Sequence, residues 1–564
     1  MTESKPSTLL QGTSDSTLVL RRIAIGAIAL ICVTIWFANI GYRSLAEPDE
    51  GRYAEIAREM LASGDWVTPH LNAIPYLEKP PLQYWATALG YSVFGIQPWV
   101  ARLWPATLGL LGILVTYATG RKLWGPRAGE FAALIAASCP LYFVIAHINI
   151  LDIGVSFFMN AAMACFLLAQ QGRPDRPAER HWMWLCWLAL ACGFLQKGLM
   201  ALALPALTLL AYCLAYRHWQ LWRRLHLRDG LIIVAVISLP WLLLVSARVP
   251  GFLQFFFVHE QFDRFATTVH RRTEPWWYFI GILAVGVLPW ISVVARAIFH
   301  RNYDRRDEQG IHATALLLIW AAVIVVFFSL SGSKLAPYIV PVVPPLALVT
   351  GRWLQLRGTV RALWPVVIIS GVFCALWLAL EPLVSHFVAP GIKQTTYLSI
   401  VPWARAAGLL GAAGLAIALV AIRRGNLRLA VTALGASFSA ALSVFMCGSN
   451  SLAVLRVKPG LAAAITPHLT ADTSLYCVGM YWHTLTFDLQ RTCTLVEYVG
   501  EIEVQFDAGQ RHSLRGITEF LAQWQQEQSA VAIVDPDVWP SLKAGGLTAR
   551  PVVQDDKVVV IVRP

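Results

Sequence analysis

The sequence predicts an all-α polytopic membrane protein that ends in a small soluble α/β domain. Of its 564 residues, 57% are hydrophobic and only 14% are charged, whereas a soluble domain carries about 25% charged residues. Apolar runs of about 17–25 residues recur along most of the chain, and each is long enough to cross a bilayer. After about residue 450 these runs stop. The first two observations predict the membrane region, and the third predicts the terminal domain.

The apolar runs predict about 13 transmembrane helices. They lie near residues 23–41, 98–120, 129–147, 152–170, 182–196, 199–216, 230–248, 276–297, 312–330, 335–351, 363–383, 403–422 and 429–447. A polar segment, 1–22, precedes the first run. The apolar segment 82–95 is too short to be a span and contains polar residues.

Basic residues gather in every second loop, which predicts the orientation by the positive-inside rule. The segment 1–22 is then cytoplasmic, and the domain 23–449 is embedded in the membrane. Its long segments 42–97 and 249–275 lie on the outer side, as does the tail 450–564. The net charge of +12 therefore records topology and indicates no nucleic-acid partner. We expect a monomer surrounded by membrane lipids.

The tail has the pattern of a small α/β domain. Short runs typical of strands lie at 474–478, 492–499, 530–535 and 557–562, and a helical pattern occupies 517–526. Cys477 and Cys493 fall on two of these predicted strands. An oxidising compartment would allow a disulfide between them.

Charge is concentrated in the first long outer loop, within 47–85. Pro48 suits the first turn of a helix. Asp49, Arg52 and Tyr53 then lie on one face of that helix, which is otherwise apolar and predicts a helix lying flat on the membrane. An acidic first turn also stabilises any helix through its dipole. Because so much charge surrounds it, we favour a functional role for Asp49.

Two other outer segments carry candidate groups. Two prolines follow Glu78 and Lys79 and hold this pair on an extended, rigid loop, suited to a metal ion or a phosphate. In the second segment, three phenylalanines precede His259 and are followed by Arg264. Glu78 and His259 together would supply half of a divalent metal site, for Zn or for Mg/Mn; a local ion pair and an uninvolved histidine are the alternatives.

Cations on the outer side break the positive-inside pattern and suggest anionic ligands. Arg52, Lys79 and Arg264 are of this kind, although such side chains also reach towards lipid head groups. Asp152 stands at the outer end of a predicted span, where an ionisable group is costly. Lys334 and Tyr338 lie among prolines at an irregular helix end.

The motifs EPDEGRY and EKPPL, at residues 47–53 and 78–82, resemble the type C glycosyltransferases. Within them, the chain is most similar to the bacterial lipid A aminoarabinose transferases, which are related to protein O-mannosyltransferases. The resemblance covers roughly 21–450 and extends more weakly over the tail.

The resemblance implies transfer of 4-amino-4-deoxy-L-arabinose from undecaprenyl phosphate to a phosphate of lipid A at the periplasmic face of the bacterial inner membrane. The outer segments and the C-terminal domain would then be periplasmic. This modification would give resistance to polymyxin and cationic peptides. Asp49, Lys79 and Arg52 would be catalytic. The substrate-binding residues would be Tyr53, Arg264, Asp152, Lys334 and Tyr338. No nucleotide is expected, since the chain lacks the Gly-rich phosphate loops.

We expect inversion by single displacement, with the cations stabilising the leaving phosphate. Asp49 would be a general base for a hydroxyl acceptor, but a phosphate acceptor is already mostly ionised, so there it would orient the acceptor or steady the transition state. Two alternatives share the same features. One is a transferase that uses another polyprenyl-linked sugar with a protein or glycan acceptor, and the other is a lipid-linked sugar transporter.

Overall fold

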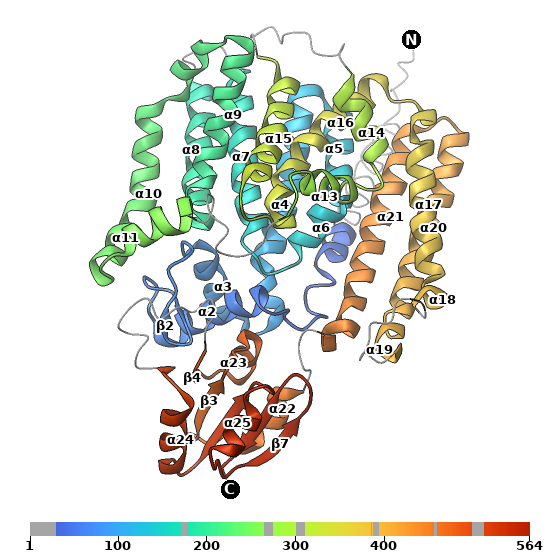
Figure 1. Ribbon diagram of the computed structural model, residues 1–564. Helices are drawn as coiled ribbons and strands as arrows, with labels where there is room; N and C mark the ends of the chain where they lie inside the picture. The colour runs from blue at the N-terminus through green and yellow to red at the C-terminus, as the bar shows by residue number, and fades with distance from the viewer. Residues whose placement is uncertain are drawn as a thin grey trace, which may run out of the picture.

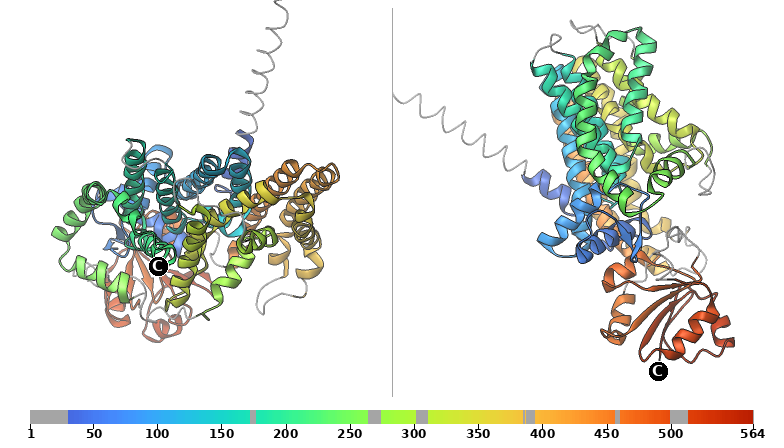
Figure 2. Two further views of the ribbon diagram at one scale, coloured as in Figure 1. Left: turned by 90° about the horizontal axis from the view of Figure 1, so that it is seen from above. Right: turned by 90° about the vertical axis from the view of Figure 1, so that its left-hand side faces the viewer.

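The computed structural model describes residues 30–171, 177–263, 274–300, 311–384, 386, 394–455, 460–498 and 513–563. It has three parts, stacked along one axis (Figure 1): a bundle of long helices, a thin layer built from the first long loop, and a C-terminal α/β domain. The side view in Figure 2 shows the same order, with the thin layer between the other two parts.

The bundle is made of apolar helices, most of them long. They are α4 (Pro98–Trp124), α5 (Pro126–Ser138), α6 (Pro140–Ala146), α7 (Asp152–Ala169), α8 (Pro177–Lys197), α9 (Met200–Tyr216), α10 (Leu227–Arg248), α13 (Tyr278–Gly286), α14 (Ile291–Phe299), α15 (Ala313–Leu330), α16 (Val343–Arg357), α17 (Trp364–Leu378), α20 (Val401–Arg423) and α21 (Leu427–Gly448). Short helical pieces connect them: α11 (Phe252–Gln254), a π-helical segment (Phe255–Asp263) and a 3-10 turn (Ala336–Val342).

Among the described residues, eight helices are long and apolar enough to cross a membrane, and up to ten if each bent pair counts as one span. The bent pairs are α5 with α6, at 67°, and α13 with α14, at 115°. Each pair occupies one predicted span, so the sequence pattern located the apolar segment but not its break. The total of thirteen spans stays a prediction.

Small residues allow the two C-terminal helices of the bundle to approach closely. A Cβ at Gly414 of α20 would lie 2.0 Å from Ser437 Oγ of α21. Close approach of this kind is what small residues provide in membrane helix pairs.

The thin layer holds α2 (Asp49–Ser63), the two-residue strands β1 (His70–Leu71) and β2 (Ile74–Pro75), and α3 (Leu82–Phe94). The helix begins where Pro48 predicted. All of its residues from Glu50 to Met60 are buried, however, so its apolar face does not lie on lipid as expected. It packs against α3, α4 and a helix of the C-terminal domain, so protein covers both of its faces.

The C-terminal domain contains a six-stranded mixed sheet, with strand order β5-β4-β3-β6-β8-β7. Its strands are β3 (Ser474–Val478), β4 (Thr494–Val496), β5 (Ser513–Leu514), β6 (Ala530–Val534), β7 (Arg550–Gln554) and β8 (Val559–Val562). The first four strands in this order run parallel, and β8 and β7 close the sheet antiparallel. The four predicted strands are present, and β5 and β7 are additional.

Helices cover both faces of this sheet, as the two-residue side-chain alternation of buried strands requires. Tyr476 and Val478 point towards α24 (Ile517–Gln526) and α25 (Trp539–Ala544). Leu475 and Cys477 belong instead to the continuous apolar core that includes α22 (Leu461–Ile465), α23 (His483–Leu489) and the membrane bundle. The core of the molecule thus extends from the bundle into this domain.

Cys477 and Cys493 are free thiols in this structure, so the expected disulfide is absent. Cys477 lies on β3, and Cys493 immediately precedes β4, its parallel neighbour. The two thiols interact without being bonded, and burial, followed by this interaction, raises the pKa of Cys493 well above its ordinary value.

Candidate functional site

The candidate site begins at the N-terminal end of α2. Asp49 is the first residue of this helix, where the helix dipole favours a carboxylate. Its side chain is 46% exposed, whereas that of Arg52, one turn later, is 6% exposed. Their charged atoms are 3.3 Å apart. A solvent-facing carboxylate is therefore held beside a buried guanidinium.

A buried ion pair fixes this end of α2 to the membrane bundle. Arg102 of α4 donates from Nε and Nη2 to the two carboxylate oxygens of Glu50, at 2.7 and 2.8 Å. The same carboxylate accepts the backbone N–H of Ala46 and of Asn149, each at 2.9 Å. Burial alone would raise the pKa of Glu50, but the charge and hydrogen bonds of Arg102 outweigh it and lower the pKa to about 2.

Tyr53 lies in the centre of the charged groups of the layer. It is buried, and its ring centroid is 6.1 Å from that of Tyr84 on α3. Burial raises the pKa of Tyr53 well above its ordinary value, the carboxylates of Asp49 and Glu78 add to the rise, and Arg52 opposes it. Side chains from α2 and from the loop before α3 thus surround one phenol.

Lys79 joins this loop to the distant segment after α11. Its ammonium is 2.7 Å from Glu260 Oε2 and 3.8 Å from Glu78 Oε2, and it donates to the Glu78 carbonyl at 3.1 Å. Tyr76 donates to the Glu78 carboxylate at 3.0 Å. Lys79 and Glu260 are both buried. The two loops singled out in the sequence therefore meet, through a residue next to His259.

His259 itself is exposed and its ring stacks on Phe255 at 5.5 Å. Phe256 is fully buried against Trp241 and Phe252. No group of three or more His, Cys, Asp and Glu side chains arranged to hold a metal occurs in the described part of the chain. The metal expected at Glu78 and His259 stays a prediction. Arg264 lies outside the described residues.

A second charged cluster lies at the start of α7. Asp152 accepts a hydrogen bond from the Lys197 ammonium at 2.5 Å, and this ammonium lies 5.1 Å from the ring centroid of Tyr338. Lys334 is buried and donates to the Ser331 carbonyl at 2.8 Å. Asp152 and Tyr338 are thus brought together by Lys197, a residue that the sequence did not single out as a candidate.

A chain of buried amides links the two clusters. Gln196, next to Lys197, donates to Gln83 of α3 at 2.8 Å, and Gln83 donates to Asn149 at 2.9 Å. Asn149 in turn donates to Glu50. All four side chains are buried, and buried polar networks that are satisfied in this way specify one arrangement. A continuous series of hydrogen bonds thus connects Gln196, the neighbour of Lys197, to Glu50, the neighbour of Asp49.

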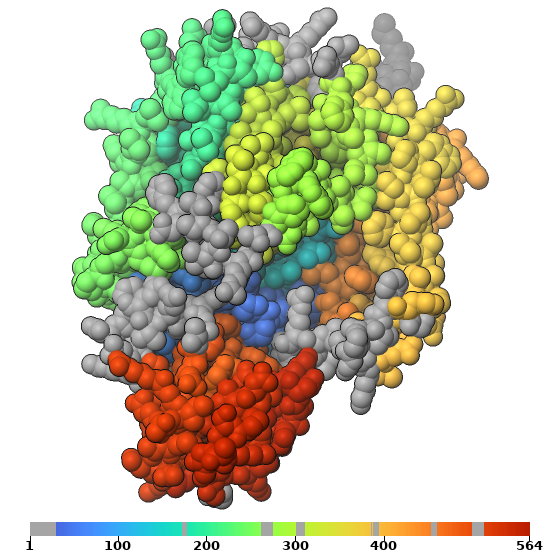
Figure 3. All heavy atoms as spheres, viewed as in Figure 1, coloured from blue at the N-terminus to red at the C-terminus, as the bar shows by residue number. Residues whose placement is uncertain are grey.

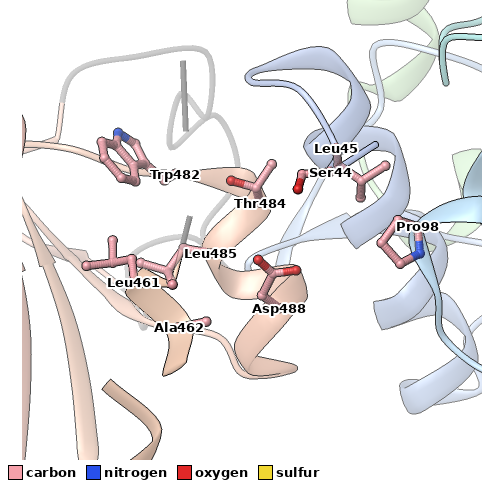
Figure 4. Close-up of a pocket in the computed structure, with 10 residues that line it drawn as sticks. Ser44, Leu45, Pro98, Leu461, Ala462, Trp482, Thr484, Leu485 and Asp488 are labelled. Atoms are coloured by element: carbon pink, nitrogen blue, oxygen red, sulfur yellow. The ribbon is translucent and has the colours of Figure 1, made fainter. Parts of the chain in front are cut away.

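The layer that carries these groups is visible from outside. In the space-filling view of Figure 3, its blue atoms lie at the floor of a recess between the bundle and the C-terminal domain. A separate cavity of about 160 Å³ lies between the layer and that domain (Figure 4). Its lining includes Ser44, Pro98, Thr484, Leu485 and Asp488, and none of the predicted site residues.

Three ion pairs of this region were not predicted from the sequence: Glu50 with Arg102, Lys79 with Glu260, and Asp152 with Lys197. The signal for Arg102 and Lys197 was present, because each is a cation at the outer end of a predicted span. The sequence alone could not say which carboxylate each one meets.

Two family models match the chain. Residues 23–303 match the model described as dolichyl-phosphate-mannose-protein mannosyltransferase, and residues 461–563 match the aminoarabinose transferase C-terminal domain. The crystal structure of ArnT from Cupriavidus metallidurans bound to undecaprenyl phosphate is similar at a TM-score of 0.88 and 36% sequence identity, covering 95% of this chain and 97% of that chain. The chain belongs to the ArnT family. The apo state of that ArnT gives a TM-score of 0.86, with 96% and 98% covered.

Curated relatives agree with membership of the ArnT family. An undecaprenyl phosphate-alpha-4-amino-4-deoxy-L-arabinose arabinosyl transferase of Pseudomonas fluorescens (strain Pf-5) is 37% identical over 358 residues, which is 62% of this chain and 59% of the relative. The transferase of Pseudomonas aeruginosa (strain LESB58) is 37% identical over 313 residues, 55% of this chain and 56% of the relative. These alignments span less than two thirds of either relative. The resemblance to a glycosyltransferase family is confirmed.

Proposed function

We propose that this ArnT-family protein transfers 4-amino-4-deoxy-L-arabinose from undecaprenyl phosphate to a phosphate of lipid A. The proposal is supported by three charged groups on one layer beside a membrane bundle: an exposed carboxylate at Asp49 and two buried cations, Arg52 and Lys79. Asp49 and Arg52 act on the same phenol, Tyr53, as does Glu78, whose carboxylate is 3.8 Å from the Lys79 ammonium. A lipid-linked sugar phosphate needs apolar surface for its tail and cations for its phosphate. The similarity to an ArnT bound to undecaprenyl phosphate over 95% of this chain supports the same donor class.

The donor phosphate would be held by Lys79 and Arg52. Lys79 is paired with Glu260 at 2.7 Å, so its charge is oriented before the donor arrives. When the bond between the anomeric carbon and the phosphate oxygen breaks, its electron pair leaves with the phosphate, and the cations stabilise that growing charge. Undecaprenyl phosphate is then the leaving group and needs no proton.

The acceptor would approach on the side of Asp49. An oxygen of a lipid A phosphate attacks the anomeric carbon from the face opposite the leaving group, which inverts the configuration. This oxygen is already mostly ionised near neutral pH. Asp49 therefore orients the acceptor or stabilises positive charge on the sugar, and its 46% exposure leaves it accessible to do so.

We further propose the topology that the basic loops predict. The N-terminus is cytoplasmic, and the α2–α3 layer and the C-terminal domain face the periplasm, where lipid A would arrive within the outer leaflet of the inner membrane. Neutralising lipid A phosphates in this way would lower the binding of polymyxin and other cationic peptides.

The test is the mass spectrum of lipid A from cells that lack their own aminoarabinose transferase but make its donor. Expression of the wild-type chain should add one aminopentose to a lipid A phosphate, and expression of Asp49→Asn should not. Lipid A that stays unmodified, with the protein present in the membrane, would contradict the proposed acceptor.

A second candidate is transfer of another polyprenyl-linked sugar to a protein, because residues 23–303 match the mannosyltransferase model. The same cells distinguish it. A glycosylated envelope protein beside unmodified lipid A would favour this candidate.

A further inference from the structure

The C-terminal domain contacts the short segment that leads into the helix of the catalytic candidate. Glu47 lies two residues ahead of Asp49, and its carboxylate accepts hydrogen bonds from His483 Nδ1, at 2.9 Å, and from the backbone N–H of Thr484. Both donors lie at the start of α23. The side chains of Glu47 and His483 are 14% and 6% exposed. Burial would raise the pKa of Glu47, but these hydrogen bonds and the charge of His483 lower it.

The first turn of α2 packs closely against the same part of α23, and no space is left there for an additional side-chain atom. A Cβ at Gly51 would lie 2.8 Å from both Cγ2 and the backbone nitrogen of Thr484. The two helices therefore meet by direct backbone contact at this point. Such a contact fixes the distance between α23 and the start of α2.

A second contact holds the other end of α2. Glu59 accepts the backbone N–H of Asn72 and of Ala73, at 2.5 and 2.8 Å, in the two-residue turn between β1 and β2. The side-chain amide of Asn72 in turn exchanges two hydrogen bonds with the backbone of Cys493, each at 2.8 Å. The domain thus contacts α2 directly near its N-terminal end and, through the turn between β1 and β2, near its C-terminal end. No catalytic candidate lies in the domain itself.

We propose that the C-terminal domain is a positioning clamp for the catalytic helix α2, and that His483 is the positioning residue that sets Asp49 through Glu47. This inference rests on the function proposed above, in which Asp49 acts at the sugar or the acceptor. His483 touches neither the donor nor the acceptor. It restricts the backbone conformation of the segment around Glu47, which leads into α2.

The clamp should affect turnover more than donor binding. The donor phosphate is assigned to Lys79 and Arg52. Glu260 and the Glu78 carbonyl hold the Lys79 ammonium, and Arg52 lies in the turn of α2 that Glu50 ties to Arg102 of the bundle. None of these contacts involves His483. The orientation of Asp49, by contrast, depends on the backbone at Glu47. A displacement of about 1 Å in a reacting group costs about 100-fold in rate, so loosening this backbone should lower kcat and leave KM for the donor nearly unchanged.

The experiment uses the purified full-length protein with a polyprenyl-phosphate aminopentose donor and lipid A. His483→Leu should lower kcat by about 10- to 100-fold with KM for the donor changed by less than about twofold. His483→Asn should restore most of the activity, because its amide N–H can take the place of Nδ1–H. His468→Leu, a histidine change elsewhere in the same domain, is the matched control and should retain wild-type rates.

A double-mutant cycle tests the route through Glu47. Glu47→Gln keeps the side-chain volume and should lower kcat to a similar degree, and combining it with His483→Leu should add little further loss. If His483→Leu fails to fold, the single Glu47→Gln variant still decides, because its kcat must fall at unchanged KM.

Three results would overturn the clamp: wild-type kcat in His483→Leu, a loss of kcat matched by an equal rise in KM, or a loss that His483→Asn does not recover. An inactive wild-type protein would count against the proposed function instead. The two failures are therefore distinguishable.

Discussion

The Glu50–Arg102 pair provides a quantitative prediction, because the hydrogen-bond donors to both carboxylate oxygens of Glu50 are known. Glu50→Gln removes one charge and turns one end of the side chain into a donor. Each carboxylate oxygen accepts one bond from Arg102 and one backbone N–H, so the new amide group must face two donors. Arg102 is fully buried, and leaving a buried charge without its partner costs about 3–5 kcal/mol.

Hydrogen–deuterium exchange of the purified protein measures this cost locally. A loss of about 3–5 kcal/mol corresponds to roughly 200- to 5,000-fold faster exchange for amides protected by opening of this region. The amides of Ala46, Asn149 and the first turns of α2 should show it. Transfer activity should fall in parallel, because Asp49 is the adjacent residue.

Glu130→Gln is the matched control for this experiment. Glu130 pairs with Arg428 at 2.8 Å, but the two side chains are 27% and 64% exposed, and exposed pairs contribute about 0–1 kcal/mol. Exchange rates in Glu50→Gln that match those of Glu130→Gln would refute the view that this buried pair fixes the site.

Three further predictions concern the same layer. Lys79→Ala should lower kcat/KM for the donor by about 10- to 100-fold, since a hydrogen bond to a charged group is worth about 1.5–3 kcal/mol; steady-state kinetics measure it, and Lys79→Arg should recover part of the loss. Burial, followed by the charge of the neighbouring Glu55 carboxylate, raises the pKa of Glu59 from 4.5 to about 7. The contribution of Glu59 to the free energy of unfolding is therefore present below about pH 4.5 and is lost as the pH rises through 7. Between these pH values the melting temperature should decline less in Glu59→Gln than in the wild type. Gly51→Ala should destabilise the protein by about 1–3 kcal/mol, because the new methyl group meets Thr484, whereas Gly281→Ala, in a helix with nothing within 4 Å, should not; thermal unfolding compares the two.

The fold was predictable from the sequence where periodicity and hydropathy decide it. Apolar length located the membrane helices, Pro48 located the start of α2, and strand-like runs located four strands of the terminal sheet. The breaks at 67° and 115° were not predictable, because mean hydropathy does not change at a bend. The burial of α2 was not predicted either. An amphipathic helix has the same apolar stripe whether that stripe lies on a membrane or against another part of the protein.

The site was predictable only in its local pairs. Asp49 and Arg52 are three residues apart on one helix, so helical geometry alone brings them together. Lys79 meets Glu260, and Asp152 meets Lys197, across 181 and 45 residues. Such pairs depend on how the helices pack against one another. The spacing of residues in a single sequence does not indicate which distant residues will meet. His483 carried no signal, because its role depends on a domain interface.

In the proposed reaction, Asp49, Arg52 and Lys79 act together in the transfer of a lipid-linked aminopentose to lipid A. The direct measurement is a reconstituted reaction with the purified protein, a labelled undecaprenyl-phosphate aminopentose and lipid A. The wild type should release undecaprenyl phosphate in step with labelled lipid A, and Asp49→Asn should form neither product at a measurable rate. Equal rates from Asp49→Asn and the wild type, or release of free sugar without labelled lipid A, would contradict the account.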